Sequence, residues 1–194
     1  MADSIDLEHI DALATGAVGE PGQREFFIQA RTASTQLTVL VEKEQVALLA
    51  TEAVAFLDRI AADFPEADEP VMPQQTVSLK EPTVPLFRAR LIGLGFDPDR
   101  ERVLIELREQ AAEEEEAAAA AAAAEEVGTP VADPASDTPG DDEPEGYVAR
   151  IYATRSQVRA MAAHGAATVA AGRPPCPLCD MPMDPAGHRC PRWN

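Results

Sequence analysis

The sequence predicts an α+β fold: two hairpin-strand-helix units that form a mainly antiparallel sheet with helices on one face. Three observations predict it. Each half of the chain contains two apolar runs separated by turn residues. Each of these pairs is followed by a further strand-like segment and then by apolar residues at helical spacing. All three cysteines lie between residues 176 and 190, which predicts a separate C-terminal knuckle.

The first unit is predicted from four consecutive patterns. Residues 12–18 and 25–30 are apolar and flank Gly19-Glu20-Pro21-Gly22-Gln23, whose Gly and Pro favour a turn and predict a hairpin. Residues 36–41 are rich in β-branched side chains and predict a third strand. From Glu42 onward, apolar residues recur every three or four positions until Pro65, which predicts a helix.

The second unit follows the same order. Residues 86–95 and 102–107 are strand-like and bracket a Pro- and Asp-containing turn over 96–100. Residues 147–153 predict another strand, and Ser156 is the predicted N-cap of a helix that ends near Ala171. Residues 66–85, with four prolines, predict a surface connection between the units.

The two units suggest an internal repeat. A chance alignment over short windows of an α+β chain is the alternative. The proposed alignment sets Pro21 against Pro98, Gly16 against Gly93, residues 26–28 against 103–105, Val39 against Ile151, Gln45 against Gln157, Leu49 against Met161 and Leu57 against Val169.

An acidic insertion separates the last two predicted strands. Residues 111–146 hold 12 acids and no bases, and residues 111–126 consist only of Ala and Glu. Such a segment cannot bury enough apolar surface to offset its ordering entropy, so we expect disorder. The expected organisation is one α+β domain formed by residues 1–110 and 147–171, a disordered insertion over 111–146, and a tail over 172–194.

The charge of the chain argues against two classes of binding partner. A formal net charge of −18 argues against general binding to nucleic acid or to an anionic membrane. We find no secretory signal and no apolar segment long enough to span a bilayer, which predicts a cytoplasmic protein. Residues 147–194 are a local exception, with 2 acids and 6 arginines.

The C-terminal segment carries the strongest chemical signal. Cys176-Pro177-Leu178-Cys179 places two thiolates within reach of one ion, and His188 and Cys190 project to the same side of an extended segment. Three thiolates and one imidazole complete a tetrahedral zinc site with no open position, so the predicted zinc is structural. Incidental tail residues, a thioredoxin-like redox pair, and iron in a rubredoxin-like site are the alternatives.

Catalytic residues are not predicted. His9, His164, Ser34 and Ser156 lack a nucleophile or acid-base arrangement, and the sequence has no Gly-rich phosphate loop of either common type. Arginine guanidinium groups suit carboxylates and phosphates, so Arg155, Arg159 and Arg173 are candidate contacts for an anion or a partner. A solvated surface is the alternative interpretation of these arginines.

Several motifs resemble an actinobacterial family of conserved proteins of unknown function: residues 172–179 (GRPPCPLC), 184–188 (DPAGH), 190–194 (CPRWN), 19–22 (GEPG) and 41–46 (VEKEQV). The resemblance covers the chain except the insertion. It implies a member of a trio of proteins encoded together, the others resembling a histidine phosphatase and a lipid-kinase-like protein. The chain also resembles ParJ-type modulators of ParA assembly in chromosome segregation.

These observations favour a non-enzymatic binding or regulatory protein with a protein partner and a structural zinc site. The first alternative is an accessory enzyme in phosphate-linked chemistry, either hydrolysis or phosphoryl transfer, that uses Arg173, or Glu42 with Lys43, in a cleft between the units. The ParJ-like role and nucleic-acid binding through the knuckle are further alternatives. The oligomeric state is not predicted.

Overall fold

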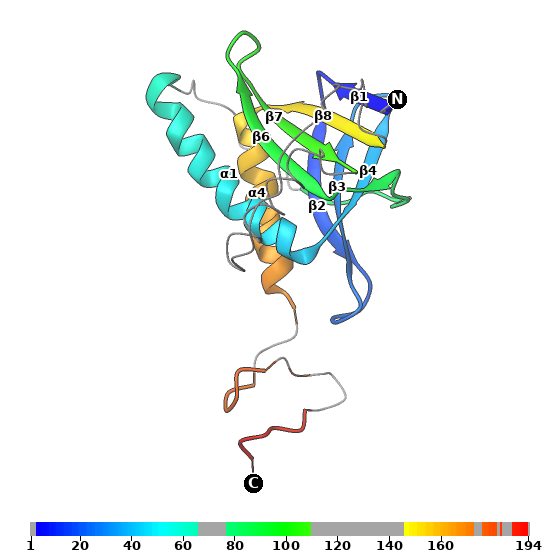
Figure 1. The fold of residues 1–194 in the computed structure, drawn as a ribbon, viewed down its shortest axis with the longest axis vertical. Coiled ribbons are helices and arrows are strands. Elements are labelled where there is room, and N and C mark those ends of the chain that lie inside the picture. Colours follow the sequence, from blue (N-terminus) through cyan, green and yellow to red (C-terminus); the bar gives the residue numbers. More distant parts are fainter. Residues whose placement is uncertain are drawn as a thin grey trace, which may run out of the picture.

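The computed structural model describes residues 3–65, 77–109, 146–172, 176–181, 183 and 188–193. It confirms the α+β class, with two helices and two mainly antiparallel four-stranded sheets (Figure 1). The predicted disordered insertion lies outside the described residues, apart from Gly146 at its end. Within the described part of the chain, no helix is long and apolar enough to cross a membrane.

The first sheet is built mainly from the predicted first unit. Strands β2 (Ala12–Val18), β3 (Glu25–Arg31) and β4 (Gln36–Val41) form an antiparallel meander. The short strand β5 (Phe87–Arg88) extends this sheet in parallel to β4.

The second sheet repeats this plan. Strands β6 (Leu91–Asp97), β7 (Arg102–Arg108) and β8 (Tyr147–Ala153) form an antiparallel meander. Strand β1 (Asp3–Leu7) extends it in parallel to β8.

The predicted single sheet is thus divided into two, and two strand boundaries differ from the prediction. Strand β1 was not expected, because its Asp-Ser-Ile-Asp-Leu sequence has only two apolar side chains, at Ile5 and Leu7. The predicted strand over 86–95 is split into β5 and β6, which belong to different sheets. Both differences depend on parallel pairing with strands far away in the sequence.

Helix α1 (Lys43–Asp63) confirms the first predicted helix and buries Val46, Leu49, Ala50, Ala53 and Leu57. Helix α4 (Arg155–Ala170) confirms the second, but its N-cap is Thr154 and not Ser156. The Thr154 hydroxyl accepts a hydrogen bond from Gln157 N at 3.1 Å, and Thr154 N donates to the Gln157 side chain. This Thr-x-x-Gln capping box satisfies two backbone donors, which explains the start of the helix.

Strand register confirms the repeat and corrects one part of the alignment. Ile28 pairs with Val39, and Ile105 pairs with Ile151, as the alignment requires. In the first hairpin, however, Gly16 corresponds to Gly95 and not to Gly93: Gly16 pairs with Phe27, and Gly95 with Leu104. The shift arises because the turn between β2 and β3 is two residues longer than the turn between β6 and β7.

The two units exchange elements. Strand β5, which precedes the second unit, completes the first sheet, and β1 completes the second sheet. Helix α4 packs against β2, whereas α1 packs against β6, and the two helices lie side by side (Figure 1). One hydrophobic core therefore contains residues of both sheets and both helices.

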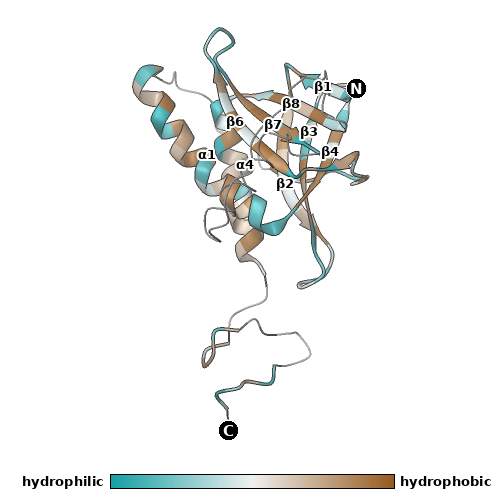
Figure 2. Cartoon of the chain, in the orientation of Figure 1, coloured by the Kyte–Doolittle hydropathy of each residue, from teal (hydrophilic) through white to brown (hydrophobic). Residues whose placement is uncertain are grey.

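Hydropathy follows this arrangement. Figure 2 shows largely hydrophobic strands, while the turns that join β2 to β3 and β6 to β7 are hydrophilic. The described end of the predicted connection packs on the first sheet: Val77 is buried, and Lys80 exchanges two backbone hydrogen bonds with the Gln29 side chain. This part of residues 66–85 therefore supports the core as well as linking the units.

Candidate metal centre

Two Cys-Pro turns form the C-terminal centre. In the first turn, Cys176 O accepts a hydrogen bond from Asp180 N at 2.9 Å, and Cys176 N donates to Met181 O at 2.8 Å. In the second turn, Trp193 N donates to Cys190 O at 3.1 Å. These bonds close each turn on its own cysteine and curve the backbone around it.

The turns bring the four predicted ligands together. One donor atom from each of Cys176, Cys179, His188 and Cys190 lies within 4.8 Å of the other three. The Sγ atoms of Cys176 and Cys190 are 3.8 Å apart, and Cys179 Sγ lies 3.1 Å from His188 Nε2. Two sulfurs bound to one tetrahedral zinc at about 2.3 Å are separated by about 3.8 Å. The observed sulfur separation therefore fits a shared ion.

A further contact joins the two turns. The Arg192 guanidinium, from the second turn, donates to Leu178 O in the first turn at 2.8 Å. Cys176 is buried, whereas the other three ligands are partly exposed. The centre is therefore enclosed on the side of Cys176.

The thiols differ in acidity. The backbone N–H of Leu178 is the main cause that lowers the pKa of Cys176 from its usual value to about 7. Burial raises the pKa of the Cys179 thiol. Since metals bind thiolates, the lowered pKa of Cys176 favours metal binding at this side chain.

The donor set suits zinc. Three sulfurs and one imidazole nitrogen are a common structural zinc set, in which the ion has no remaining position for water or substrate. The cluster can hold a metal ion and is compatible with zinc.

A protein-family model described as "Protein of unknown function (DUF3090)" matches residues 5–190. The chain belongs to the DUF3090 family. The match spans both units, the insertion and all four residues of the metal centre. Searches of curated proteins and of solved structures found no match to this DUF3090 chain. The comparisons contain no support for the phosphate-chemistry alternative or for the ParJ-like alternative.

The three candidate arginines of the DUF3090 chain do not share one environment. Arg155 is 6% exposed, and its guanidinium donates to Phe64 O at 2.7 Å and lies 5.0 Å from the centre of the Phe96 ring. Arg159 is exposed on the same helix. Arg173 lies outside the described residues. Arg155 thus joins the start of α4 to the end of α1.

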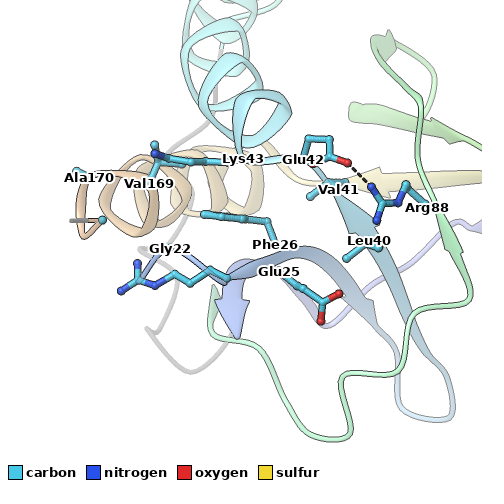
Figure 3. Close-up of a pocket in the computed structure, with 12 residues that line it drawn as sticks. Gly22, Glu25, Phe26, Leu40, Val41, Glu42, Lys43, Arg88, Val169 and Ala170 are labelled. Carbon is cyan, nitrogen blue, oxygen red and sulfur yellow. Dashed lines mark hydrogen bonds and ion pairs between the residues drawn. The ribbon is translucent and has the colours of Figure 1, made fainter. Parts of the chain in front are cut away.

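Glu42 and Lys43 lie in a pocket at the start of α1 (Figure 3). The sequence did not single out Arg24 and Arg88, which also line it. Arg88 forms an ion pair with Glu42. Arg88 on β5 and Arg24 beside the β2–β3 turn lie far apart in the sequence, which gave no signal that both would line the same pocket.

Proposed function

We propose that this chain is a non-enzymatic binding or regulatory protein whose C-terminal knuckle folds around one structural zinc ion held by Cys176, Cys179, His188 and Cys190. The convergence of these four side chains carries the proposal. Four protein ligands leave a tetrahedral ion without a position for substrate, so the ion shapes the tail and takes no part in a reaction. The proposal includes a cytoplasmic location, where a reducing environment keeps the thiols free to bind metal.

A protein partner is the second part of the proposal. Leu178, Met181 and Trp193 have exposed fractions of 48%, 51% and 79%. All three belong to the knuckle, which lies beyond the end of α4 (Figure 1). Trp and Met are enriched at protein interfaces, where an aromatic anchor often contributes much of the binding energy. Zinc would hold the turns that present these side chains.

The metal content of purified full-length protein tests the zinc site. Elemental mass spectrometry should find one zinc per chain in the wild type and its loss in Cys179→Ser and His188→Ala. His164→Ala is the matched control, because His164 lies on α4 outside the cluster, and it should retain zinc.

Two results would contradict the zinc site. Zinc retained in full by both ligand variants would show that the ion is bound elsewhere. A freshly reduced protein without metal would leave three free thiols and favour the redox alternative. Iron found in place of zinc would support the same four ligands but show that the bound metal is iron.

The partner is tested separately with Trp193→Ala. In affinity capture with the purified chain as bait, this variant should keep its zinc and no longer retain the protein that the wild type retains. Leu48→Ala, which removes another exposed apolar side chain, on α1, should keep both. Turnover of a phosphate ester that depends on Glu42 or Lys43 would instead establish the enzyme alternative. Altered ParA assembly on addition of the protein would establish the ParJ-like alternative.

A further inference from the structure

A pocket of about 480 Å³ lies between the first unit and the C-terminal end of α4 (Figure 3). Phe26, Leu40 and Val41 contribute an apolar wall from β3 and β4, and Val169 and Ala170 contribute the facing part of α4. This volume falls within the usual range of small-molecule sites.

Some charged side chains around the pocket form ion pairs and others do not. Glu42 is paired with Arg88, and the Glu25 carboxylate points away from Lys43 (Figure 3). The ion pairs of the described residues include neither Lys43 nor Arg24. The lining thus contains three cations (Arg24, Lys43 and Arg88) and two anions (Glu25 and Glu42), which leaves one net positive charge for an anion to meet.

The Lys43 side chain lies across the pocket, close to the end of α4 (Figure 3). It extends from the start of α1 toward the end of α4 (Figure 3), where a Cβ placed on Gly172 would lie 4.0 Å from Lys43 Nζ. The last turn of α4 has no basic residue of its own. The negative end of the helix dipole therefore favours Lys43 in this position.

The internal repeat shows a smaller side chain on the strand beside Phe26, which is one of the residues that line the pocket. Ala17 and Phe96 are equivalent, because Ala17 pairs with Phe26 in the first hairpin and Phe96 pairs with Val103 in the second. A methyl group in the first unit thus takes the place of an aromatic ring in the second.

The same comparison relates Lys43 to Arg155, since each is the first residue of its helix. In the second unit Arg155 is buried, donates to Phe64 O and stacks over Phe96, so the place is filled. In the first unit Lys43 is exposed beside a pocket. The equivalent positions therefore form a packed contact in the second unit and an open pocket in the first.

We propose that this pocket binds a small molecule with a carboxylate or phosphate group on an apolar body. Lys43 and Arg24 contact the anionic group, and the body lies against Phe26. The described lining contains no Ser, Thr, Cys or His side chain, so it offers no hydroxyl, thiol or imidazole nucleophile. The pocket is independent of the proposed zinc ion, because none of the four candidate ligands lines it.

Ligand-observed NMR titration of the full chain tests the proposal with four probes: phenyl phosphate, benzoate, inorganic phosphate and benzylamine. Phenyl phosphate and benzoate should bind, and their relative affinity distinguishes a phosphate from a carboxylate site. Inorganic phosphate should bind more weakly, because it lacks the apolar body, and cationic benzylamine should not bind. Lys43→Gln should weaken the preferred anion roughly 3- to 10-fold.

Lys80→Gln is the matched control, since Lys80 is the only other lysine and its exposed side chain lies outside the pocket. It should bind the probes as the wild type does. Ala17→Phe, which copies the second unit, should abolish binding of both aromatic anions while zinc content is retained. Equal affinities in Lys43→Gln and Lys80→Gln, or binding of benzylamine as tight as that of benzoate, would overturn the proposal. So would the absence of binding by both aromatic anions at millimolar concentration.

Discussion

Gln45 and Gln157 make the same hydrogen bonds in the two units. Each side chain accepts from the backbone N–H of its helix N-cap residue at 2.8 Å. Each also donates to the segment that enters the other unit: Gln45 to Arg90 O at 3.0 Å, and Gln157 to Ile10 O at 2.9 Å. The pair therefore fixes both helix starts and ties the exchanged units together.

Loss of Gln157 should destabilise the protein. Gln157 is 5% exposed, so Gln157→Ala removes the capping box and leaves the Ile10 carbonyl without this donor. We expect the free energy of unfolding to fall by about 1–3 kcal/mol, measured by urea denaturation. Gln23→Ala, in an exposed turn, should change it by less than about 0.5 kcal/mol. Equal effects of the two variants would contradict this role.

Arg155, which is buried, should contribute more to stability than Arg159, which is exposed on the same helix. Arg155→Ala removes the hydrogen bond to Phe64 O and the contact with the Phe96 ring, at an expected cost of about 1–3 kcal/mol. Arg159→Ala removes the same charge from an exposed position and should cost less than about 0.5 kcal/mol. Thermal unfolding of both variants checks the difference. A larger loss of stability in Arg159→Ala than in Arg155→Ala would contradict the structural role of Arg155.

Gly165 should be required by close packing and not by backbone freedom. A Cβ at this position would lie 2.9 Å from Thr15 Cγ2 and 3.2 Å from Val46 Cγ1. Better helix propensity favours Gly165→Ala by about 0.5–1 kcal/mol, but overpacking costs about 1–3 kcal/mol, so we expect net destabilisation. Denaturant unfolding measures the result.

A second substitution makes the Gly165 prediction specific. Thr15→Ser removes Cγ2 and keeps the hydroxyl that donates to Phe27 O at 3.0 Å. Combined with Gly165→Ala, it should restore part of the lost stability. Strictly additive losses would show that the two positions do not conflict.

Replacing residues 111–146 with Gly-Asn-Gly should keep the fold, which tests the insertion boundary expected from the sequence. Strands β7 and β8 are already neighbours, and Glu109 N donates to Tyr147 O at 2.9 Å, so a short turn can join them. Shorter loop closure should leave stability unchanged or raise it by up to about 2 kcal/mol. Circular dichroism and urea denaturation measure this. Loss of cooperative unfolding would show that the segment belongs to the core.

Trp193 should report on the metal centre. It is the only tryptophan, and its N–H closes the turn on Cys190. Removal of zinc by a strong chelator should change its fluorescence emission, while far-UV circular dichroism of the sheets and helices stays constant. Added zinc should reverse the change in the wild type and have no effect in His188→Ala. Fluorescence emission that stays the same when zinc is measurably lost would contradict the proposed link between Trp193 and the metal centre.

Patterns within short stretches of sequence predicted most elements. The spacing of Val46, Leu49, Ala53 and Leu57 placed α1. Gly and Pro placed the first hairpin, and Pro and Asp placed the second. The N-cap of α4 was misplaced by two residues, because Ser156 and Thr154 are both good caps and only the bond to Gln157 decides between them. The metal cluster was predictable because all four ligands lie within fifteen residues of sequence.

The sequence by itself determined the helices, the hairpins, their repetition and the Cys-His cluster, since each depends on residues that are close together along the chain. Only the tertiary structure decided that β1 and β5 exchange between sheets, that Arg155 is buried, and that Lys43 faces a pocket. These features depend on contacts between segments far apart in sequence. Their free energy comes from shared burial and pairing, which local periodicity does not record.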